Sequence, residues 1–254
     1  MAAEARRHWL LLRGLAREAR HWGAFTEVFS RVTGDVAHCL DLPGAGTEAG
    51  SPCPTAMRGL SEDLRRRWLP LRDAHPGEWS LLGISLGGMV SMQWCADHPQ
   101  DFARVVLVNT SAANIGLPWE RMDWKVIRSL PAALRETDMV RRERLILGLT
   151  SRVAGDLDAV AARNAAFARE RPMRRRNVLR QLAAASTFRA PPRLDTPALV
   201  VAGAKDPLAS PVCGRRLAAR FNAPLREHPE AGHDMGLDAP EWLAEVARDF
   251  AQRA

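Results

Sequence analysis

The stretch Trp79-Ser-Leu-Leu-Gly-Ile-Ser-Leu-Gly-Gly-Met-Val-Ser-Met-Gln-Trp-Cys-Ala96 decides the fold of this chain. Its short apolar run breaks at Gly83-Ile-Ser-Leu-Gly87, and a pattern typical of an amphipathic helix follows. We expect a strand, a sharp turn that carries Ser85, and a helix, so that the Ser85 hydroxyl stands above the end of a sheet. Glycine is needed on both sides of the turn because a side chain there would collide with neighbouring backbone.

Apolar strand-like runs alternate with helix-like segments on both sides of this stretch. The strand-like runs have apolar residues at nearly every position instead of every second one, which is typical of strands covered on both faces. We expect strands at 8–14, 36–44, 80–84, 104–109, 196–203 and 224–228, and helices at 22–32, 54–71, 85–98, 211–221 and 240–252. The predicted fold class is therefore α/β, with a mostly parallel sheet and helices on both faces.

The alternation stops between residues 112 and 190. This segment has no strand-like run, and its pattern predicts four helices at 119–130, 132–149, 157–171 and 173–187. A helical insert between two parallel strands must pack over one end of the sheet, so we expect it to act as a lid. The predicted organisation is a core in two parts, 1–111 and 191–254, with the helical lid at 112–190 between them.

Composition indicates a globular protein without a membrane span. The chain has 254 residues, 46% of them hydrophobic, and no apolar run long enough to cross a bilayer. Its four cysteines, Cys39, Cys53, Cys95 and Cys213, lack metal-ligand spacing. We expect reduced, mostly buried thiols in a cytoplasmic protein, and no metal site.

The net charge of +7 is concentrated in the helical insert. Residues 112–190 contain 16 Lys and Arg against 8 Asp and Glu, which leaves 20 against 21 in the remainder of the chain. Arginines such as Arg141 and Arg142 are candidates to hold an acidic partner protein or a substrate carboxylate or phosphate, although a solvated helix face explains such charge equally well. Nucleic-acid binding is not expected, because no recognised module accompanies the charge. Trp119 and Trp124 are either core of the insert or part of an acyl pocket.

A serine becomes a strong nucleophile when a histidine accepts its proton and a carboxylate holds that histidine. His233 is the best candidate base, because Pro229-Glu-Ala-Gly-His-Asp-Met-Gly236 is a glycine-flanked loop after the last strand. Asp206 is the best candidate acid, since it follows the apolar strand that ends near Gly203. The order Ser85, Asp206, His233 fits a serine hydrolase with this strand pattern. The oxyanion donors would be the backbone N–H groups of Leu86 and Leu15.

These motifs resemble the α/β-hydrolase superfamily, in particular its lidded serine carboxylesterase branch. The resemblance covers nearly the whole chain and rests on Arg13-Gly14, Asp41-Leu-Pro-Gly-Ala-Gly46, Gly83-Ile-Ser-Leu-Gly-Gly88, Ala103-Arg-Val-Val-Leu-Val-Asn109, Gly203-Ala-Lys-Asp206 and Ala231-Gly-His233. The arginine-rich insert is similar to that of esterases whose acyl substrate is linked to an acidic carrier protein. Arg13 stands where the family usually has histidine, which changes the charge beside the site and makes Arg13 a further candidate for substrate contact. The antiparallel hairpin that often opens the fold is not expected.

The resemblance implies hydrolysis of carboxylic esters through an acyl-enzyme, without a metal or organic cofactor. A thioesterase, a lactonase or a carbon–carbon-bond hydrolase would use the same residues, and a non-catalytic binding protein on this scaffold is the alternative from another class. Serine at position 85 argues against haloalkane dehalogenases and epoxide hydrolases, which need aspartate there.

Overall fold

A six-stranded parallel sheet forms the centre of the molecule in a computed structural model that describes residues 7–153 and 155–253, apart from the side chains at positions 127, 130, 131, 133 and 134. The strand order is β2-β1-β3-β4-β5-β6, and each pair of neighbours is parallel. The strands are β1 (Arg7–Leu12), β2 (Val36–Cys39), β3 (Glu78–Ile84), β4 (Arg104–Val108), β5 (Ala198–Gly203) and β6 (Leu225–His228). The predicted α/β class with a parallel sheet is confirmed.

Helices cover both faces of the sheet, as the apolar strands predict. One face packs against α1 (Phe25–Thr33) and α11 (Pro240–Gln252), and the other packs against α2 (Met57–Ala74), α3 (Leu86–Asp97) and α9 (Pro211–Phe221). Alternate side chains of β1 therefore enter different cores. Leu10 and Leu12 pack on the side of α2, α3 and α9, whereas Trp9 and Leu11 pack on the side of α1 and α11. Three short helical segments lie in the connections: η1 (Ala19–Trp22), η2 (Gly46–Glu48) and α10 (Met235–Asp238).

The helix after Ser85 differs from the amphipathic helix expected from the sequence. In α3, side chains on nearly every side are buried, including Met89, Met92 and Cys95. The reason is that α3 packs against β3, β4 and α2 together, so little of its surface is exposed to solvent. A helix that is apolar all round is typical of such a central position.

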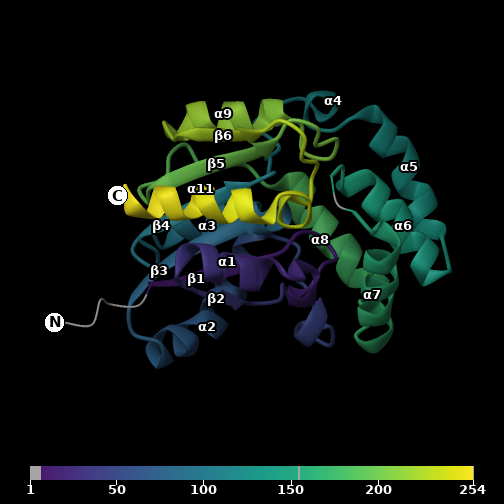
Figure 1. The fold of residues 1–254 in the computed structure, drawn as a ribbon, viewed down its shortest axis with the longest axis horizontal. Coiled ribbons are helices and arrows are strands. Elements are labelled where there is room, and N and C mark those ends of the chain that lie inside the picture. Colours follow the sequence, from purple (N-terminus) through teal and green to yellow (C-terminus); the bar gives the residue numbers. More distant parts are fainter. Residues whose placement is uncertain (1–6, 154, 254) are drawn as a thin grey trace.

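The helical insert between β4 and β5 contains α4 (Pro118–Arg121), α5 (Trp124–Arg135), α6 (Met139–Thr150), α7 (Leu157–Glu170) and α8 (Arg175–Thr187). Figure 1 shows α5 to α8 gathered on one side of the molecule, opposite the two chain termini. Two hydrogen-bonded contacts join the ends of the insert. The Ala113 N–H donates to Phe188 O at 2.7 Å, and the Asn114 side chain bonds both the N–H and the C=O of Ala190, at 2.8 and 3.0 Å.

The predicted boundaries of the first two helices in the insert are wrong. The sequence pattern predicts one helix over 119–130 and another over 132–149, whereas the chain breaks at Asp123 and again before α6, and α5 continues through the break expected at position 131. Carboxylates decide these starts: Asp123 accepts the N–H of Lys125, and Asp138 accepts the N–H of Arg141, both at 2.8 Å. Side-chain capping of this kind specifies where a helix begins more strongly than apolar spacing does.

Two further expectations concern the whole chain. None of the described helices is both long enough and apolar enough to cross a membrane. The four cysteines are free thiols, three of them buried, as the sequence predicts.

Candidate active site

Ser85 lies in a strained turn between β3 and α3. Its backbone angles are φ 57° and ψ −118°, in a region that residues with a side chain rarely adopt. The flanking glycines are required by close backbone contacts. A Cβ on Gly83 would lie 2.4 Å from the carbonyl oxygen of Gly87, and a Cβ on Gly87 would lie 2.4 Å from that of Leu12. Such strain at a strand-to-helix turn is a recurrent feature of nucleophile positions.

Neighbouring strands hold this turn in place. The Ser85 N–H donates to Val108 O at 2.9 Å, and Thr110 Oγ1 donates to Ser85 O at 2.8 Å. Gly14, which follows β1, abuts the serine so closely that a Cβ at that position would lie 3.0 Å from Ser85 Cβ. The loop at residues 13–17, called the oxyanion loop below, therefore lies directly beside the Ser85 side chain.

Asp206 and His233 form a buried hydrogen-bonded pair. His233 Nδ1 lies 2.8 Å from Asp206 Oδ2, and the Asp206 side chain is fully buried. The other carboxylate oxygen accepts the N–H groups of Leu208 at 2.8 Å and Ala209 at 3.0 Å. These bonds fix the carboxylate, which in turn fixes a proton on His233 Nδ1 and leaves Nε2 as the basic nitrogen.

Asn109, at the end of β4, holds the loop at residues 229–236, called the histidine loop below. Its side-chain amide donates to the carbonyl oxygens of Gly232 at 2.9 Å and His233 at 2.8 Å, and its Oδ1 accepts the Gly203 N–H at 2.7 Å. Sequence reasoning gave Asn109 no role. A polar residue that ends a fully apolar strand is the signal that points to it.

Ser85, Asp206 and His233 follow β3, β5 and β6, so all three lie at the carboxyl edge of the sheet. Register supports this placement, because Ile84 pairs with Val108, Val108 with Val201, and Gly203 with His228. Within the described chain, Ser85 Oγ makes no hydrogen bond to His233. Bonds of this type are often long without substrate and shorten when the substrate binds.

The expected oxyanion donors are two backbone N–H groups beside Ser85. Leu86 is the first residue of α3, so its N–H has no acceptor within the helix. On the oxyanion loop, the N–H of Ala16 donates to Gln181 Oε1 at 3.0 Å and that of Arg17 to Gly14 O at 3.2 Å. The N–H of Leu15 has no hydrogen-bond acceptor among the described residues.

Arg13, a candidate for substrate contact from the sequence, makes its described contacts within the protein. Its guanidinium donates two hydrogen bonds to the Asp234 carboxylate, at 2.9 and 2.7 Å, and lies over the Trp22 ring at 4.7 Å from the centroid. Both partners are buried. Burial alone would raise the pKa of the Asp234 carboxyl, but the charge and hydrogen bonds of Arg13 outweigh it and hold that pKa below its ordinary value.

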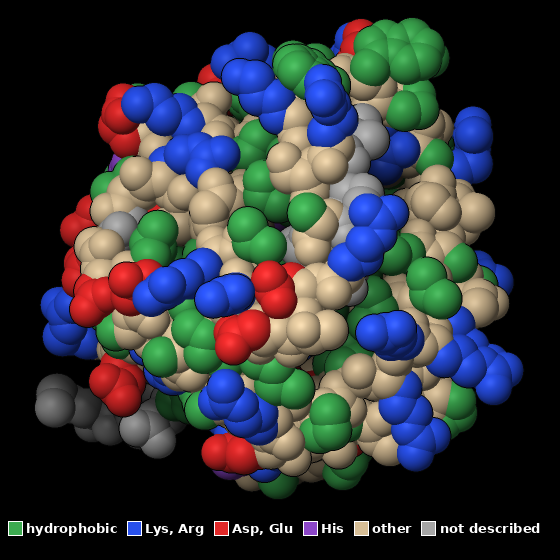
Figure 2. All heavy atoms as spheres, turned by 90° about the vertical axis from the view of Figure 1, so that its right-hand side faces the viewer, with side chains coloured by type: hydrophobic (Ala, Val, Ile, Leu, Met, Phe, Trp, Pro, Cys, Tyr) green, Lys and Arg blue, Asp and Glu red, His purple; other side chains and the backbone are tan. Residues whose placement is uncertain are grey.

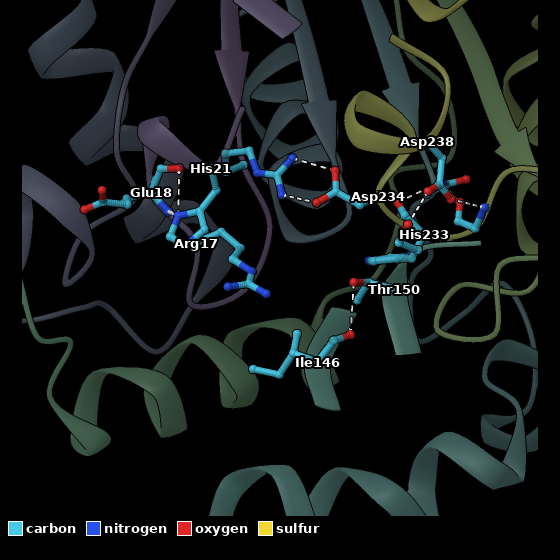
Figure 3. Close-up of polar contacts among 12 residues, drawn as sticks. Arg17, Glu18, His21, Ile146, Thr150, His233, Asp234 and Asp238 are labelled. Carbon is cyan, nitrogen blue, oxygen red and sulfur yellow. Dashed lines mark hydrogen bonds and ion pairs between the residues drawn. The ribbon is translucent and has the colours of Figure 1, made fainter. Parts of the chain in front are cut away.

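The helical insert is joined to the histidine loop at the end of α6. The N–H of Asp234 donates to Thr150 O at 2.8 Å. The Asp238 carboxylate accepts the N–H of Gly232 at 2.7 Å, the N–H of Arg152 at 2.9 Å and the hydroxyl of Ser151. Figure 3 shows Asp234, Asp238 and His233 close together, with Thr150 facing them from the insert.

The remaining candidates lie on the outside of the insert. Trp119 and Trp124 are 70% and 58% exposed. They are therefore not part of the insert's core, which was one of the two roles expected for them. Arg141 is exposed and Arg142 is half-buried. In the described part of the chain, no group of three or more His, Cys, Asp and Glu side chains is arranged to hold a metal ion.

A strained serine turn and a His–Asp pair on one edge of a parallel sheet define an α/β hydrolase. Residues 9–246 match the alpha/beta hydrolase family, and the chain belongs to this family. A relative from Chromobacterium violaceum, a pimeloyl-[acyl-carrier protein] methyl ester esterase, is 29% identical over 223 residues, which cover 84% of each chain.

Solved structures show the same fold at lower identity. The enol-lactonase from Burkholderia xenovorans has a TM-score of 0.74 at 23% identity, covering 98% of this chain and 92% of that one. A putative non-heme bromoperoxidase from Mycobacterium tuberculosis has a TM-score of 0.73 at 20% identity, covering 99% and 94%. At these identities the likeness establishes the fold and not the reaction.

Proposed function

We propose that this protein is a serine hydrolase that cleaves carboxylic esters, with Ser85 as nucleophile, His233 as general base and Asp206 as its orienting acid. The observation that carries the proposal is the 2.8 Å bond between His233 and the buried Asp206, at the edge where the strained Ser85 turn also lies. The esterase among its relatives supports the ester as the bond that is cleaved.

The reaction proceeds in two halves. Ser85 Oγ forms a bond to the ester carbonyl carbon while its proton passes to His233 Nε2, and the oxyanion accepts hydrogen bonds from the N–H groups of Leu86 and Leu15. The C–O bond to the alcohol then breaks, and His233 gives its proton to the departing oxygen. Water repeats the sequence on the acyl-enzyme, releasing the acid and restoring Ser85.

A fluorophosphonate probe tests this assignment directly. We expect stoichiometric labelling of Ser85 in the wild type and none in Ser85→Ala, together with loss of esterase activity in that variant. Asp206→Asn is expected to keep the serine but lower kcat by about 10⁴-fold, because the histidine tautomer is no longer fixed. A folded wild-type protein that neither reacts with the probe nor hydrolyses any ester would rule the proposal out in favour of a binding protein.

We propose further that the helical insert receives an acyl substrate that is anionic or linked to an acidic carrier protein. The acidic residues of the insert are already engaged: Glu143 pairs with Arg17, Glu170 with Arg20, and Glu120 with Arg216. The other acidic residues cap helices, bond backbone or pair with Arg144: Asp123, Glu136, Asp138, Asp156 and Asp158. Within the described chain, Arg144 is the only cation of the insert that forms an ion pair.

The outer surface of the insert fits this substrate class. Figure 2 shows Lys and Arg side chains distributed over much of this side of the molecule, with hydrophobic side chains between them. A hollow of about 530 Å³ lies between α5 and α6, and both apolar residues (Leu145 and Leu149) and arginines (Arg141 and Arg144) line it. A panel of esters that vary in acyl length and terminal charge, with and without a carrier protein, identifies the preferred substrate.

A further inference from the structure

The buried ion pair between Arg13 and Asp234 connects two segments that the proposed mechanism uses. Arg13 directly precedes Gly14 and Leu15 on the oxyanion loop, and Asp234 directly follows His233. The two residues are 221 positions apart in the chain and are joined by two hydrogen bonds, at 2.9 and 2.7 Å. Figure 3 shows the pair of bonds that reaches the Asp234 carboxylate.

We propose that Arg13 and Asp234 form a positioning pair, which sets the distance and angle between the oxyanion donors and the basic nitrogen of His233. This inference rests on the proposed function. A planar guanidinium that meets a carboxylate through two parallel bonds fixes orientation as well as separation, which a single bond or an apolar contact does not.

The surroundings of the pair immobilise both partners. Arg13 lies over Trp22, and the Asp234 backbone accepts the N–H groups of Leu237 at 3.0 Å and Asp238 at 2.9 Å. The Asp234 N–H is held by Thr150 of the insert. A movement of either loop would therefore have to break a buried, doubly bonded contact.

Stability alone is a poor explanation for such a pair. Taking two charges out of water costs free energy that their attraction often fails to return, and well-packed apolar residues of similar volume stabilise equally well or better. The pair also leaves Arg13 Nε buried without a hydrogen-bond partner. Alignment of the oxyanion loop with the histidine loop would explain why a pair with this free-energy cost is present. A shift of about 1 Å in a reacting group lowers the reaction rate by as much as 10²-fold.

The test compares Arg13→Met and Asp234→Asn with a matched control, Arg65→Met. Arg65 also makes two bonds to a buried carboxylate, that of Asp101, at 2.6 and 3.3 Å, but Asp101 precedes β4 and lies at the opposite edge of the sheet from Ser85. We expect kcat for a small neutral ester to fall about 10- to 100-fold in both pair variants with KM changed less than about threefold. Arg65→Met is expected to change Tm without changing kcat.

Two double variants separate positioning from folding. Arg13→Met with Asp234→Leu is expected to keep the wild-type Tm but not kcat, whereas Arg13→Asp with Asp234→Arg is expected to recover part of kcat. If the apolar double variant keeps kcat within twofold of wild type, the pair is only structural and the inference is wrong. If instead the wild type itself lacks labelling at Ser85 and ester turnover, the proposed function fails first and the inference fails with it.

Discussion

At the scale of single residues, the strained backbone conformation of Ser85 requires glycine at the neighbouring positions 83 and 87. Gly83 and Gly87 lie against backbone and Ser91 so closely that even a methyl group has no room. The strain at Ser85 therefore persists because the surrounding chain holds it there, at a cost of order 1–3 kcal/mol.

Gly83→Ala and Gly148→Ala are expected to change stability in opposite directions. A methyl group at Gly83 would lie 2.4 Å from Gly87 O and Ser91 Oγ, so we expect a loss of about 1–3 kcal/mol and a displaced Ser85. Gly148 lies in α6 with nothing within 4 Å of an added Cβ, so alanine is expected to stabilise the protein by about 0.5–1 kcal/mol. Urea unfolding of both variants measures this, and equal effects would contradict the structural explanation.

Sequence reasoning could predict the positions of residues whose signal is local. Ser85 and Asp206 each follow an apolar run, and His233 lies in a glycine-flanked loop, so their common edge could be predicted. The contacts of Asn109 and of Arg13 could not, since their partners are 124 and 221 positions away. A pattern read along the chain shows that a polar residue ends a strand, but not which loop will reach it.

At the scale of elements, η1 contains a histidine that is kept neutral. His21 Nδ1 accepts the N–H of Glu18 at 3.1 Å, and its ring contacts Phe167 of α7. Burial, with the nearby charges of Arg17 and Arg13, lowers the pKa of His21 from 6.5 to about 2. Because the unfolded chain binds this proton more readily, acid is expected to favour unfolding.

His21→Gln is expected to reduce the acid sensitivity of the fold. The folded-state pKa of His21 lies below the unfolded value, so stability is retained above pH 6.5 and falls as pH decreases below it, by up to about 1.4 kcal/mol per pH unit. His38, whose pKa burial lowers to about 4, adds to the slope and remains in the variant. Urea unfolding between pH 7 and 4.5 measures the slopes, and identical slopes for variant and wild type would refute the lowered pKa of His21.

Helix boundaries in the insert show where element prediction fails. Apolar spacing correctly predicts helical structure between β4 and β5, but it is continuous across Asp123 and Asp138, where the chain bends. The bends depend on which carboxylate caps a backbone N–H, and acidic residues are frequent enough in helices that their presence alone does not mark a cap.

At the scale of the whole molecule, the excess of positive over negative charge belongs to the helical insert. Residues 112–190 carry an excess of eight basic residues, since 16 Lys and Arg oppose 8 Asp and Glu. The acidic side chains of the insert that pair with Arg17 and Arg20 attach it to the core, and most of the insert's own arginines are exposed. A surface with an excess of one sign of charge raises the rate at which an oppositely charged partner arrives.

Arg141→Glu with Arg142→Glu is expected to lower kcat/KM for a carrier-linked ester by about tenfold or more at low salt, and much less at high salt, because screening removes the attraction. Hydrolysis of a small neutral ester is expected to stay unchanged. Arg226→Glu with Arg253→Glu, on exposed residues outside the insert, gives the same change in net charge and serves as the control. Equal effects of the two double variants on the carrier-linked ester would show that only net charge matters and that docking at 141 and 142 is wrong.

The hydrogen bonds that tie Ala113 to Phe188 and Asn114 to Ala190 bring the two ends of the insert side by side, between strands that are already neighbours. The chain thus leaves the core and returns at almost the same point. The insert can therefore change in length or sequence without altering the register of any strand, provided that the bonds from Thr150 to Asp234 and from Arg152 to Asp238 are kept. If the insert receives the substrate, as we propose, a change of specificity requires new residues between this neck of the insert and those bonds, while the sheet that carries Ser85, Asp206 and His233 stays as it is.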